Sequence, residues 1–231
     1  MTGNYLDQFL FGILPYVAFL TFFLVTISRY RSRKFTYSSL SSQFLENQQH
    51  FWGIVPFHYG ILMVLTGHVV AFLIPRQILL WNSEPLRLYV LEISALVFGL
   101  LTLIGLTGAI MRRLTVSKVK QVTSLRDWIL HVLLASQVIS GIGVALFHPW
   151  GSSWFAAAAT PYLWSVVRLN PNVTAIAAMP AVAKFHIANA YLLIGFFPFT
   201  RLIHILVAPN PYLWRKPQVV RWYRAPGTAT R

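Results

Sequence analysis

Hydrophobic residues are concentrated in five long stretches of the chain, and polar or basic segments separate each stretch from the next. A helix needs roughly 20 apolar residues to cross the ~30 Å hydrocarbon core of a bilayer. Five stretches reach this length, with approximate bounds Tyr5–Ile27, Phe51–Ile74, Leu88–Ile110, Trp128–Phe147 and Ala183–Val207. The pattern predicts an all-α membrane protein with five transmembrane helices in a bundle.

The composition supports a membrane location and excludes several kinds of chemistry. Of the 231 residues, 56% are apolar and 10% are charged, whereas a soluble domain carries about 25% charged residues. The mean hydropathy is +0.60. Cysteine is absent, which excludes a disulfide, a thiolate nucleophile, a cysteine-held iron–sulfur cluster and a covalently attached haem.

The basic residues predict the orientation of the spans. The net charge is +14, from 19 basic and 5 acidic residues. In a soluble protein this excess would suggest nucleic acid, but in an apolar chain it is a topology signal, so we expect no nucleic-acid partner. Basic residues gather after the first and third spans and in the tail, at Arg29, Arg31, Arg33, Lys34, Arg112, Arg113, Lys118, Lys120, Arg126, Arg215, Lys216, Arg221, Arg224 and Arg231. The other loops hold only Arg76, Arg87 and Arg168, with Lys184 at the start of the fifth span. Because Lys and Arg accumulate on the cytoplasmic side, the N-terminus is expected outside and the C-terminus inside.

Two parts of the chain follow from this topology. Residues 1–208 form a transmembrane domain, and residues 209–231 form a basic cytoplasmic tail that we expect to dock a partner protein. The loop from His148 to Met179 lies outside, and its Pro, Trp and Asn residues suggest an ordered cap on the membrane surface.

Histidines supply the candidate chemistry within the membrane. The chain has seven, at His50, His58, His68, His131, His148, His186 and His204, whereas Glu92 is the only acid well within a span. Ionisable groups at membrane depth are costly and usually functional. A proton or cation transporter usually needs intramembrane carboxylates, whereas neutral imidazole needs no counter-charge when it binds a metal. Haem with two axial histidines is the common case in membranes.

Axial spacing leaves two ways of pairing these histidines. His58 and His68 on the second span are ~15 Å apart along an ideal helix, and the antiparallel fifth span carries His186 near the outside and His204 near the inside. The latter two are 18 residues apart, or ~27 Å on a straight helix, unless the helix bends at Pro198. His131 and His148 on the fourth span, ~25 Å apart, match that spacing better, but their side chains point roughly 100° apart. Both pairings stay open on geometry.

Two segments resemble the gamma subunit of respiratory nitrate reductase, a di-haem cytochrome b. One is the sequence Phe-His-Tyr-Gly-Ile at residues 57–61, followed by Gly67 and His68. The other runs from Phe197 to Ile205 and continues into the Tyr-Leu-Trp-Arg-Lys sequence at residues 212–216. Shorter matches lie at residues 41–43 and 112–114. The resemblance extends over nearly the whole chain, including five spans of the same orientation.

The resemblance implies a ligand set and a direction of electron flow. His58 and His204 match the ligands of an inner haem b, and His68 and His186 those of an outer haem b, whereas no family ligand matches His131 or His148. Family members oxidise membrane quinol near the outer face of the prokaryotic plasma membrane. Their haems pass electrons to an iron–sulfur subunit and then to a molybdenum catalytic subunit.

The resemblance also suggests smaller roles and leaves alternatives. Arg87 matches a family lysine that helps bind quinol, so Arg87 and His68 are expected at the quinol site. Arg201 precedes His204 by three residues on the same helical face and could pair with a haem propionate. Glu92 is a candidate proton acceptor, or simply a buried hydrogen-bonding group. Two other functions remain possible: a di-haem anchor of another reductase, such as a heterodisulfide- or sulfite-type complex, and a haem-free transporter whose histidines line a pore.

Overall fold

The computed structural model describes residues 5–32, 48–203 and Leu206, all of them helical or in short connections between helices. Five helical segments are long and apolar enough to cross a membrane: Tyr5–Ser32, Phe51–Leu73, Pro85–Thr115, Leu125–Phe147 and Ala181–Phe199. They include α1 (Tyr5–Gln8), α2 (Leu14–Ser32), α3 (Gln48–Leu73), α5 (Pro85–Thr115), α7 (Leu125–Phe147) and α11 (Ala181–Phe196). The predicted fold class is therefore confirmed as five long apolar helices.

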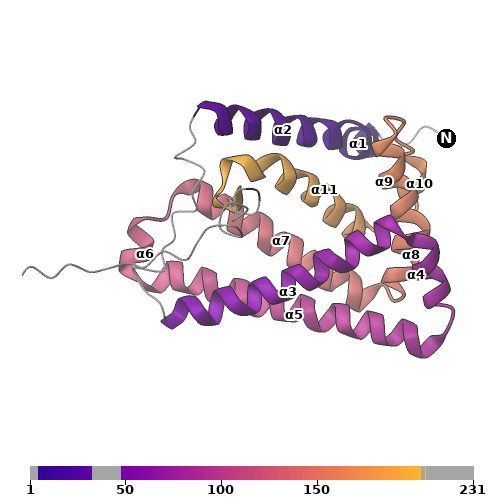
Figure 1. The fold of residues 1–231 in the computed structure, drawn as a ribbon, viewed down its shortest axis with the longest axis horizontal. Coiled ribbons are helices and arrows are strands. Elements are labelled where there is room, and N and C mark those ends of the chain that lie inside the picture. The colour runs from indigo at the N-terminus through magenta and orange to yellow at the C-terminus, as the bar shows by residue number, and fades with distance from the viewer. Residues whose placement is uncertain (1–4, 33–47, 204–205, 207–231) are drawn as a thin grey trace, which may run out of the picture.

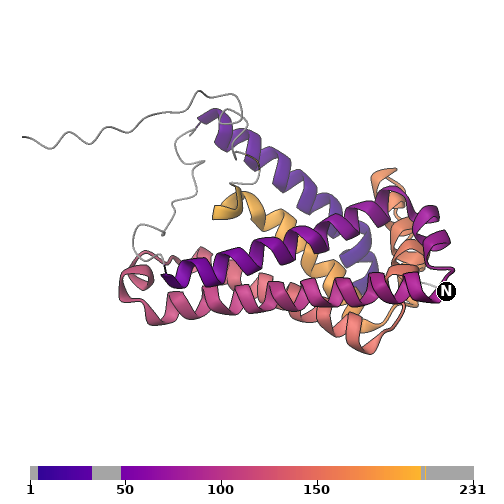
Figure 2. The same ribbon diagram turned by 60° about the horizontal axis from the view of Figure 1, so that its bottom comes forward.

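Consecutive spans run in opposite directions and form two packed groups. Helix α3 lies along α5, and α11 lies between α2 and α7 (Figure 1). Helix α5 also packs on α7 and joins the two groups. After a rotation of the view, α2 diverges from α3 and α5 (Figure 2). Many apolar side chains on these helices face outward, among them Leu24 (64% exposed), Leu62 (59%) and Ile104 (63%), as expected for a surface covered by lipid.

Glycines let α3 and α5 approach closely. The backbones meet at Gly53 on α3 and Gly108 on α5, where a Cβ added to Gly108 would lie 3.2 Å from the Gly53 Cα atom. A Cβ at Gly105 would lie 2.7 Å from the carbonyl oxygen of Gly53 and from the Cα atom of Phe57. Small residues permit such contact between membrane helices. The position of α3, which carries His58 and His68, therefore depends on these glycines.

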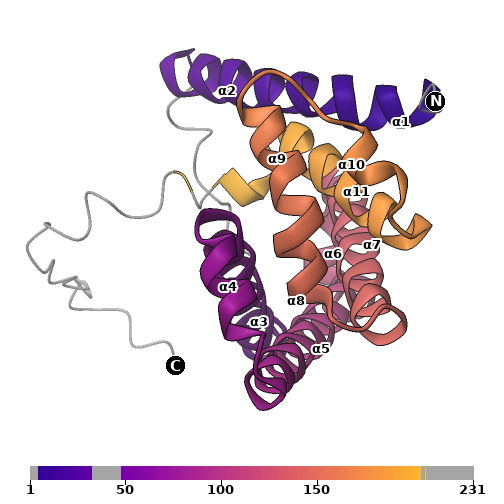
Figure 3. The same ribbon diagram turned by 90° about the vertical axis from the view of Figure 1, so that its right-hand side faces the viewer.

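Short helices gather at one end of the bundle and connect its two groups. They are α4 (Pro75–Trp81), α8 (Gly151–Trp154), a π-helical turn at Phe155–Ala159, α9 (Thr160–Val167) and α10 (Thr174–Ala177). Figure 3 shows α9 crossing between the α3–α4 corner and α2. The Trp164 ring stacks on Phe72 with centroids 4.7 Å apart, and Tyr162 donates a hydrogen bond of 2.8 Å to the Phe11 carbonyl oxygen. The segment expected to form an ordered cap is thus helical and packed.

The opposite end holds the last turn of α2, α6 (Ser117–Gln121) and the start of α7 (Figure 1). The fifth span departs here from the predicted helix, which was expected to continue to Val207. Helix α11 ends at Phe196, and two 3₁₀ turns follow at Phe197–Phe199 and Arg201–Ile203. Pro198 has no backbone N–H to continue the helix, and Thr200 is extended, with φ −109° and ψ 175°. The break falls at Pro198, where the sequence allowed a bend, and the predicted end at Val207 lies outside the described residues.

Candidate functional site

His68 and His186 face each other from two helices that are distant in the sequence. Their ring centroids are 6.4 Å apart and the ring planes are inclined by 32°. His68 lies in the last third of α3 and His186 near the start of α11. The edge of Phe155, from the cap, also contacts His68, with centroids 5.2 Å apart. Antiparallel helices therefore bring together two of the predicted ligands.

The two histidines of α3 share one local geometry. Nδ1 of His68 lies 2.8 Å from the carbonyl oxygen of Val64, and Nδ1 of His58 lies 2.8 Å from that of Ile54. Each acceptor is four residues earlier on the same helix. A carbonyl oxygen can only accept, so Nδ1 carries the proton in both rings, and each Nε2 keeps a lone pair. This is the tautomer in which Nε2 can bind a metal.

The ring of His186 packs against α7, which contacts both of its nitrogen atoms. The Ser140 hydroxyl lies 3.0 Å from Nδ1 and the Gln137 amide nitrogen lies 3.1 Å from Nε2. The buried Asn189 donates to the Gln137 amide oxygen at 2.7 Å, which directs the Gln137 amide nitrogen toward the histidine. A Cβ added to Gly141 would lie 2.9 Å from Cε1 of His186, so the ring lies directly against the α7 backbone.

The spacing of His68 and His186 fits a metal held between them. Two metal–nitrogen bonds of ~2.0–2.1 Å, with ~1.1 Å from each nitrogen to its ring centre, separate the ring centroids by about 6 Å. The observed 6.4 Å agrees with this value. Neither ring contacts a carboxylate through a described hydrogen bond, which suits neutral ligands in an apolar surrounding. The donor set is therefore compatible with a bis-histidine haem.

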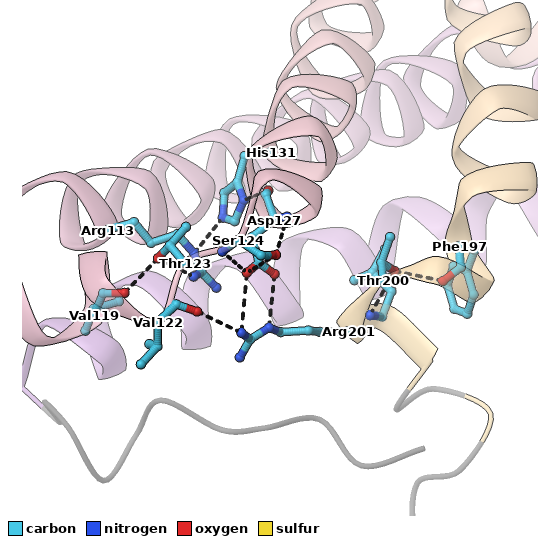
Figure 4. Close-up of polar contacts among 11 residues, drawn as sticks. Arg113, Val119, Val122, Thr123, Ser124, Asp127, His131, Phe197, Thr200 and Arg201 are labelled. Atoms are coloured by element: carbon cyan, nitrogen blue, oxygen red, sulfur yellow. Dashed lines mark hydrogen bonds and ion pairs between the residues drawn. The ribbon is translucent and has the colours of Figure 1, made fainter. Parts of the chain in front are cut away.

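The other candidate on the fourth span is engaged elsewhere. His131 is buried, its Nδ1 lies 2.5 Å from the Asp127 carbonyl oxygen, and its Nε2 accepts a hydrogen bond of 3.2 Å from Nε of Arg113. The guanidinium of Arg113 also reaches the Thr123 hydroxyl at 3.2 Å. Figure 4 shows His131 within this polar cluster at the start of α7. The nitrogen of His131 that a metal would require is thus occupied by an arginine.

The same cluster holds the segment that follows α11. Nε of Arg201 lies 3.0 Å from Oδ1 of Asp127, and its Nη2 lies 3.3 Å from Oδ2 (Figure 4). Arg201 also donates to the Val122 carbonyl oxygen at 3.1 Å. The Asp127 side chain further accepts from the backbone N–H and hydroxyl of Ser124, both at 2.9 Å, and the Asp127 N–H donates to the Ser124 hydroxyl oxygen at 3.3 Å, which completes a capping box for α7. The propionate role of Arg201 stays a prediction.

The remaining candidates lie apart from this cluster. Arg87 is exposed in the first turn of α5, with its guanidinium carbon 5.3 Å from the centre of the Trp81 ring. Glu92 accepts hydrogen bonds from the backbone N–H of Ser152 at 2.8 Å and from its hydroxyl at 2.5 Å, so it ties α5 to α8. His148 ends α7 and lines a cavity of about 390 Å³ beside the cap. His204 lies outside the described residues.

Comparison with known proteins decides the family. The model of the nitrate reductase gamma subunit matches residues 7–223. This chain belongs to the nitrate reductase gamma subunit family. It is 32% identical over 218 residues to the nitrate reductase gamma chain of Bacillus subtilis (strain 168), covering 93% of this chain and 97% of that protein. It is 30% identical over 227 residues to the respiratory nitrate reductase 2 gamma chain of Escherichia coli (strain K12), covering 94% and 98%.

A more distant relative has another named activity. The chain is 33% identical over 130 residues to one of the subunits of the dihydromethanophenazine:CoB–CoM heterodisulfide reductase of Methanosarcina barkeri (strain Fusaro / DSM 804). The match covers 54% of this gamma subunit family member and 42% of the relative.

Sequence reasoning missed the residues around the histidines of this gamma subunit family member. The sequence does not show which residues of the other helices contact His186, so it did not single out the residues around this ring, which are Gln137, Ser140 and Asn189. A signal was present, since Gln137 and Asn189 are amides within strongly apolar spans, where polar side chains usually serve a contact or a function. Asp127 carried a second signal, because Ser124 and Asp127 have the spacing of a helix capping box.

Proposed function

We propose that this protein is the membrane-anchoring, di-haem cytochrome b subunit of a respiratory nitrate reductase-type complex in the prokaryotic plasma membrane. It oxidises quinol near the outer face and passes electrons inward to an iron–sulfur subunit and a molybdenum catalytic subunit. The facing pair of His68 and His186 is the observation that carries this proposal, because it supplies two neutral axial ligands in a member of this family.

The outer haem is held by His68 and His186. Support comes from the 6.4 Å separation of their rings and from the Nδ1 hydrogen bonds, which place the lone pair of each ring on Nε2. In His186 that lone pair accepts from the neutral Gln137 amide, which iron would have to displace, whereas His131 is held by a charged guanidinium. A haem with two axial histidines has no open iron position, so it supplies one-electron transfer rather than substrate activation.

The inner haem is held by His58 and His204. His58 lies ten residues before His68 on α3, which is ~15 Å along the helix and roughly 80° around its axis. Its Nδ1 contact to a carbonyl four residues earlier is the one that His68 makes. The His204 assignment rests on the family resemblance.

Quinol is oxidised at the end of the bundle that carries the cap. Oxidation to quinone releases two protons and two electrons, and Arg87 contributes a charged hydrogen-bond donor beside Trp81. If protons leave on the outer side while electrons move inward, charge is separated across the membrane. Residues 1–208 are the haem-binding domain in this scheme, and residues 209–231 dock the iron–sulfur subunit.

The orientation places the cap outside and the basic end inside. Arg112 and Arg113 lie at the end of α5 beside α6, which itself carries Lys118 and Lys120, and Arg29 lies in the last turn of α2 at the same end of the bundle. This concentration of positive charge at one end of the bundle supports a cytoplasmic location for that end.

Replacement of single histidines by alanine tests the ligand assignment. In purified protein, His58→Ala or His204→Ala is expected to remove one b-type optical signal, and His68→Ala or His186→Ala the other. His131→Ala is the control and retains both signals. A colourless wild-type protein would favour the transporter hypothesis, and loss of a signal in His131→Ala would overturn the pairing.

A di-haem anchor of another reductase remains the second candidate, and the heterodisulfide reductase relative favours it. The haem spectrum is the same for both, so the partners decide between them. Co-purification of a molybdenum-containing subunit supports the nitrate reductase assignment, whereas a complex without molybdenum supports the alternative.

A further inference from the structure

We propose that Ser140 is a positioning residue for His186. Its hydroxyl fixes the tautomer of the imidazole and makes Nε2 a more basic ligand for the iron of the outer haem. This inference rests on the proposed function. Ser140 is only 6% exposed, and its hydroxyl is the group that contacts Nδ1 of His186, at 3.0 Å.

The direction of this hydrogen bond follows from the neighbours of Ser140. Its hydroxyl oxygen lies 2.6 Å from the carbonyl oxygen of Ser136 and 3.1 Å from that of Gln137. Both carbonyls can only accept, so the hydroxyl proton points to them. The hydroxyl oxygen must then accept from His186, which places the histidine proton on Nδ1 and the lone pair on Nε2.

Gly141 holds the ring against this acceptor. A Cβ at this position would lie 2.9 Å from Cε1 of His186 and 3.4 Å from Nδ1, so the imidazole occupies the space that any side chain would fill. Adjacent residues of α7 therefore give the ring a hydrogen-bond acceptor and a flat backbone surface. Rotation of the ring away from Ser140 would lose both contacts.

The two proposed ligands of the outer haem differ in the acceptor of their Nδ1 hydrogen bond. Nδ1 of His68 donates to a backbone carbonyl, an acceptor that no side-chain substitution can remove. At His186 the corresponding acceptor is a side chain. An acceptor on the outer nitrogen of a ligand histidine raises the basicity of the ring and stabilises the oxidised metal. Loss of the Ser140 hydroxyl should therefore favour the reduced haem and raise its midpoint potential.

A redox titration of membranes containing the assembled complex tests this inference. In Ser140→Ala, we expect the oxidation equilibrium of the outer haem to shift about three- to tenfold, which at 59 mV per tenfold for one electron is roughly 30 to 60 mV upward. The inner haem serves as an internal reference and keeps its potential. Ser140→Thr retains the hydroxyl and should restore the outer potential.

Ser94→Ala is the matched control, because within the described part of the chain the Ser94 hydroxyl donates only to the Leu91 carbonyl oxygen of its own helix, at 2.9 Å. Unchanged potentials in Ser140→Ala overturn the inference, as does an equal shift of both haems or a failure of Ser140→Thr to restore the value. If the wild-type complex carries no b-type haem, the proposed function itself is wrong, which is a separate outcome.

Discussion

Replacement of Asp127 by alanine should destabilise the basic end of the bundle. The side chain is only 5% exposed and accepts four hydrogen bonds, two from Ser124 and two from Arg201. The substitution removes the carboxylate half of the capping box of α7, whereas the Ser124 hydroxyl can still accept from the backbone N–H of residue 127. It also leaves the guanidinium of Arg201 without its carboxylate.

The expected cost follows from these two losses. Loss of the carboxylate half of the box, which leaves the Ser124 N–H without this acceptor, costs about 1 kcal/mol. Removal of one partner from a fully buried ion pair costs about 3–5 kcal/mol, but the Arg201 side chain is 30% exposed and therefore partly screened by solvent, so we assign about 2 kcal/mol to this contact. The total of about 3 kcal/mol corresponds to a lower apparent Tm by roughly 6–12 °C for a chain of this size.

Thermal unfolding in detergent, followed by far-ultraviolet circular dichroism, measures this change. Asp127→Asn is the matched control, because it keeps an oxygen that can cap α7 but loses the charge, and it should fall between the wild type and Asp127→Ala. The double variant Asp127→Ala/Arg201→Ala completes a thermodynamic cycle. If the two single effects add within about 0.5 kcal/mol, the ion pair contributes nothing and the reasoning is refuted.

Four further predictions concern other parts of the molecule. Gly105→Ala should cost about 1–3 kcal/mol by forcing α3 from α5, while Gly99→Ala, whose Cβ would make an ordinary 3.5 Å contact, should not destabilise the protein in the same melting assay. Arg87→Ala should lower kcat/KM for quinol about tenfold; steady-state kinetics that stay unchanged would remove Arg87 from the site. Burial raises the pKa of the Tyr162 hydroxyl well above 10.0, so its contribution is present below pH ~10 and lost above it, where the unfolded phenol ionises. Tyr162→Phe should therefore flatten the alkaline decline of Tm, and an equally steep decline would contradict this. Pro198→Ala should alter the inner b-type signal and leave the outer one, and identical spectra would show that the break in the fifth span does not position the inner ligand.

Hydropathy alone predicted the number of long apolar helices, because a chain in lipid must satisfy its backbone hydrogen bonds within each span. The basic loops predicted that the second and fifth spans are antiparallel, which allowed His68 and His186 to lie at the same depth, although a pairing from the fourth span stayed open. The observed 6.4 Å between their rings agrees with this expectation. The sequence pattern was therefore sufficient to predict the features that each helix determines by itself, namely its presence, its length and its direction.

Contacts between distant segments could not be predicted in the same way. Arg201 was expected near a propionate because only its neighbour His204 was visible in the sequence, yet its carboxylate partner Asp127 lies 74 residues earlier. The choice between the second and the fourth span as the partner of the fifth likewise depended on contacts that the sequence does not show. Arg113 contacts Nε2 of His131, and this arginine comes from the end of a different helix.

The break in the fifth span removes the main geometric objection to the proposed haem pairing. On a straight helix His186 and His204 would be ~27 Å apart, compared with ~15 Å for His58 and His68. Helix α11 instead ends at Phe196, ten residues after His186, which is the same number of residues that separates the two histidines of α3. Two 3₁₀ turns follow, separated by the extended Thr200, and two arginines hold this segment: Arg29 donates to the Pro198 carbonyl oxygen, and Arg201 pairs with Asp127. The described part of the fifth span, from His186 to Ile203, is therefore not one straight helix, so the ~27 Å spacing that favoured the fourth span no longer argues for it.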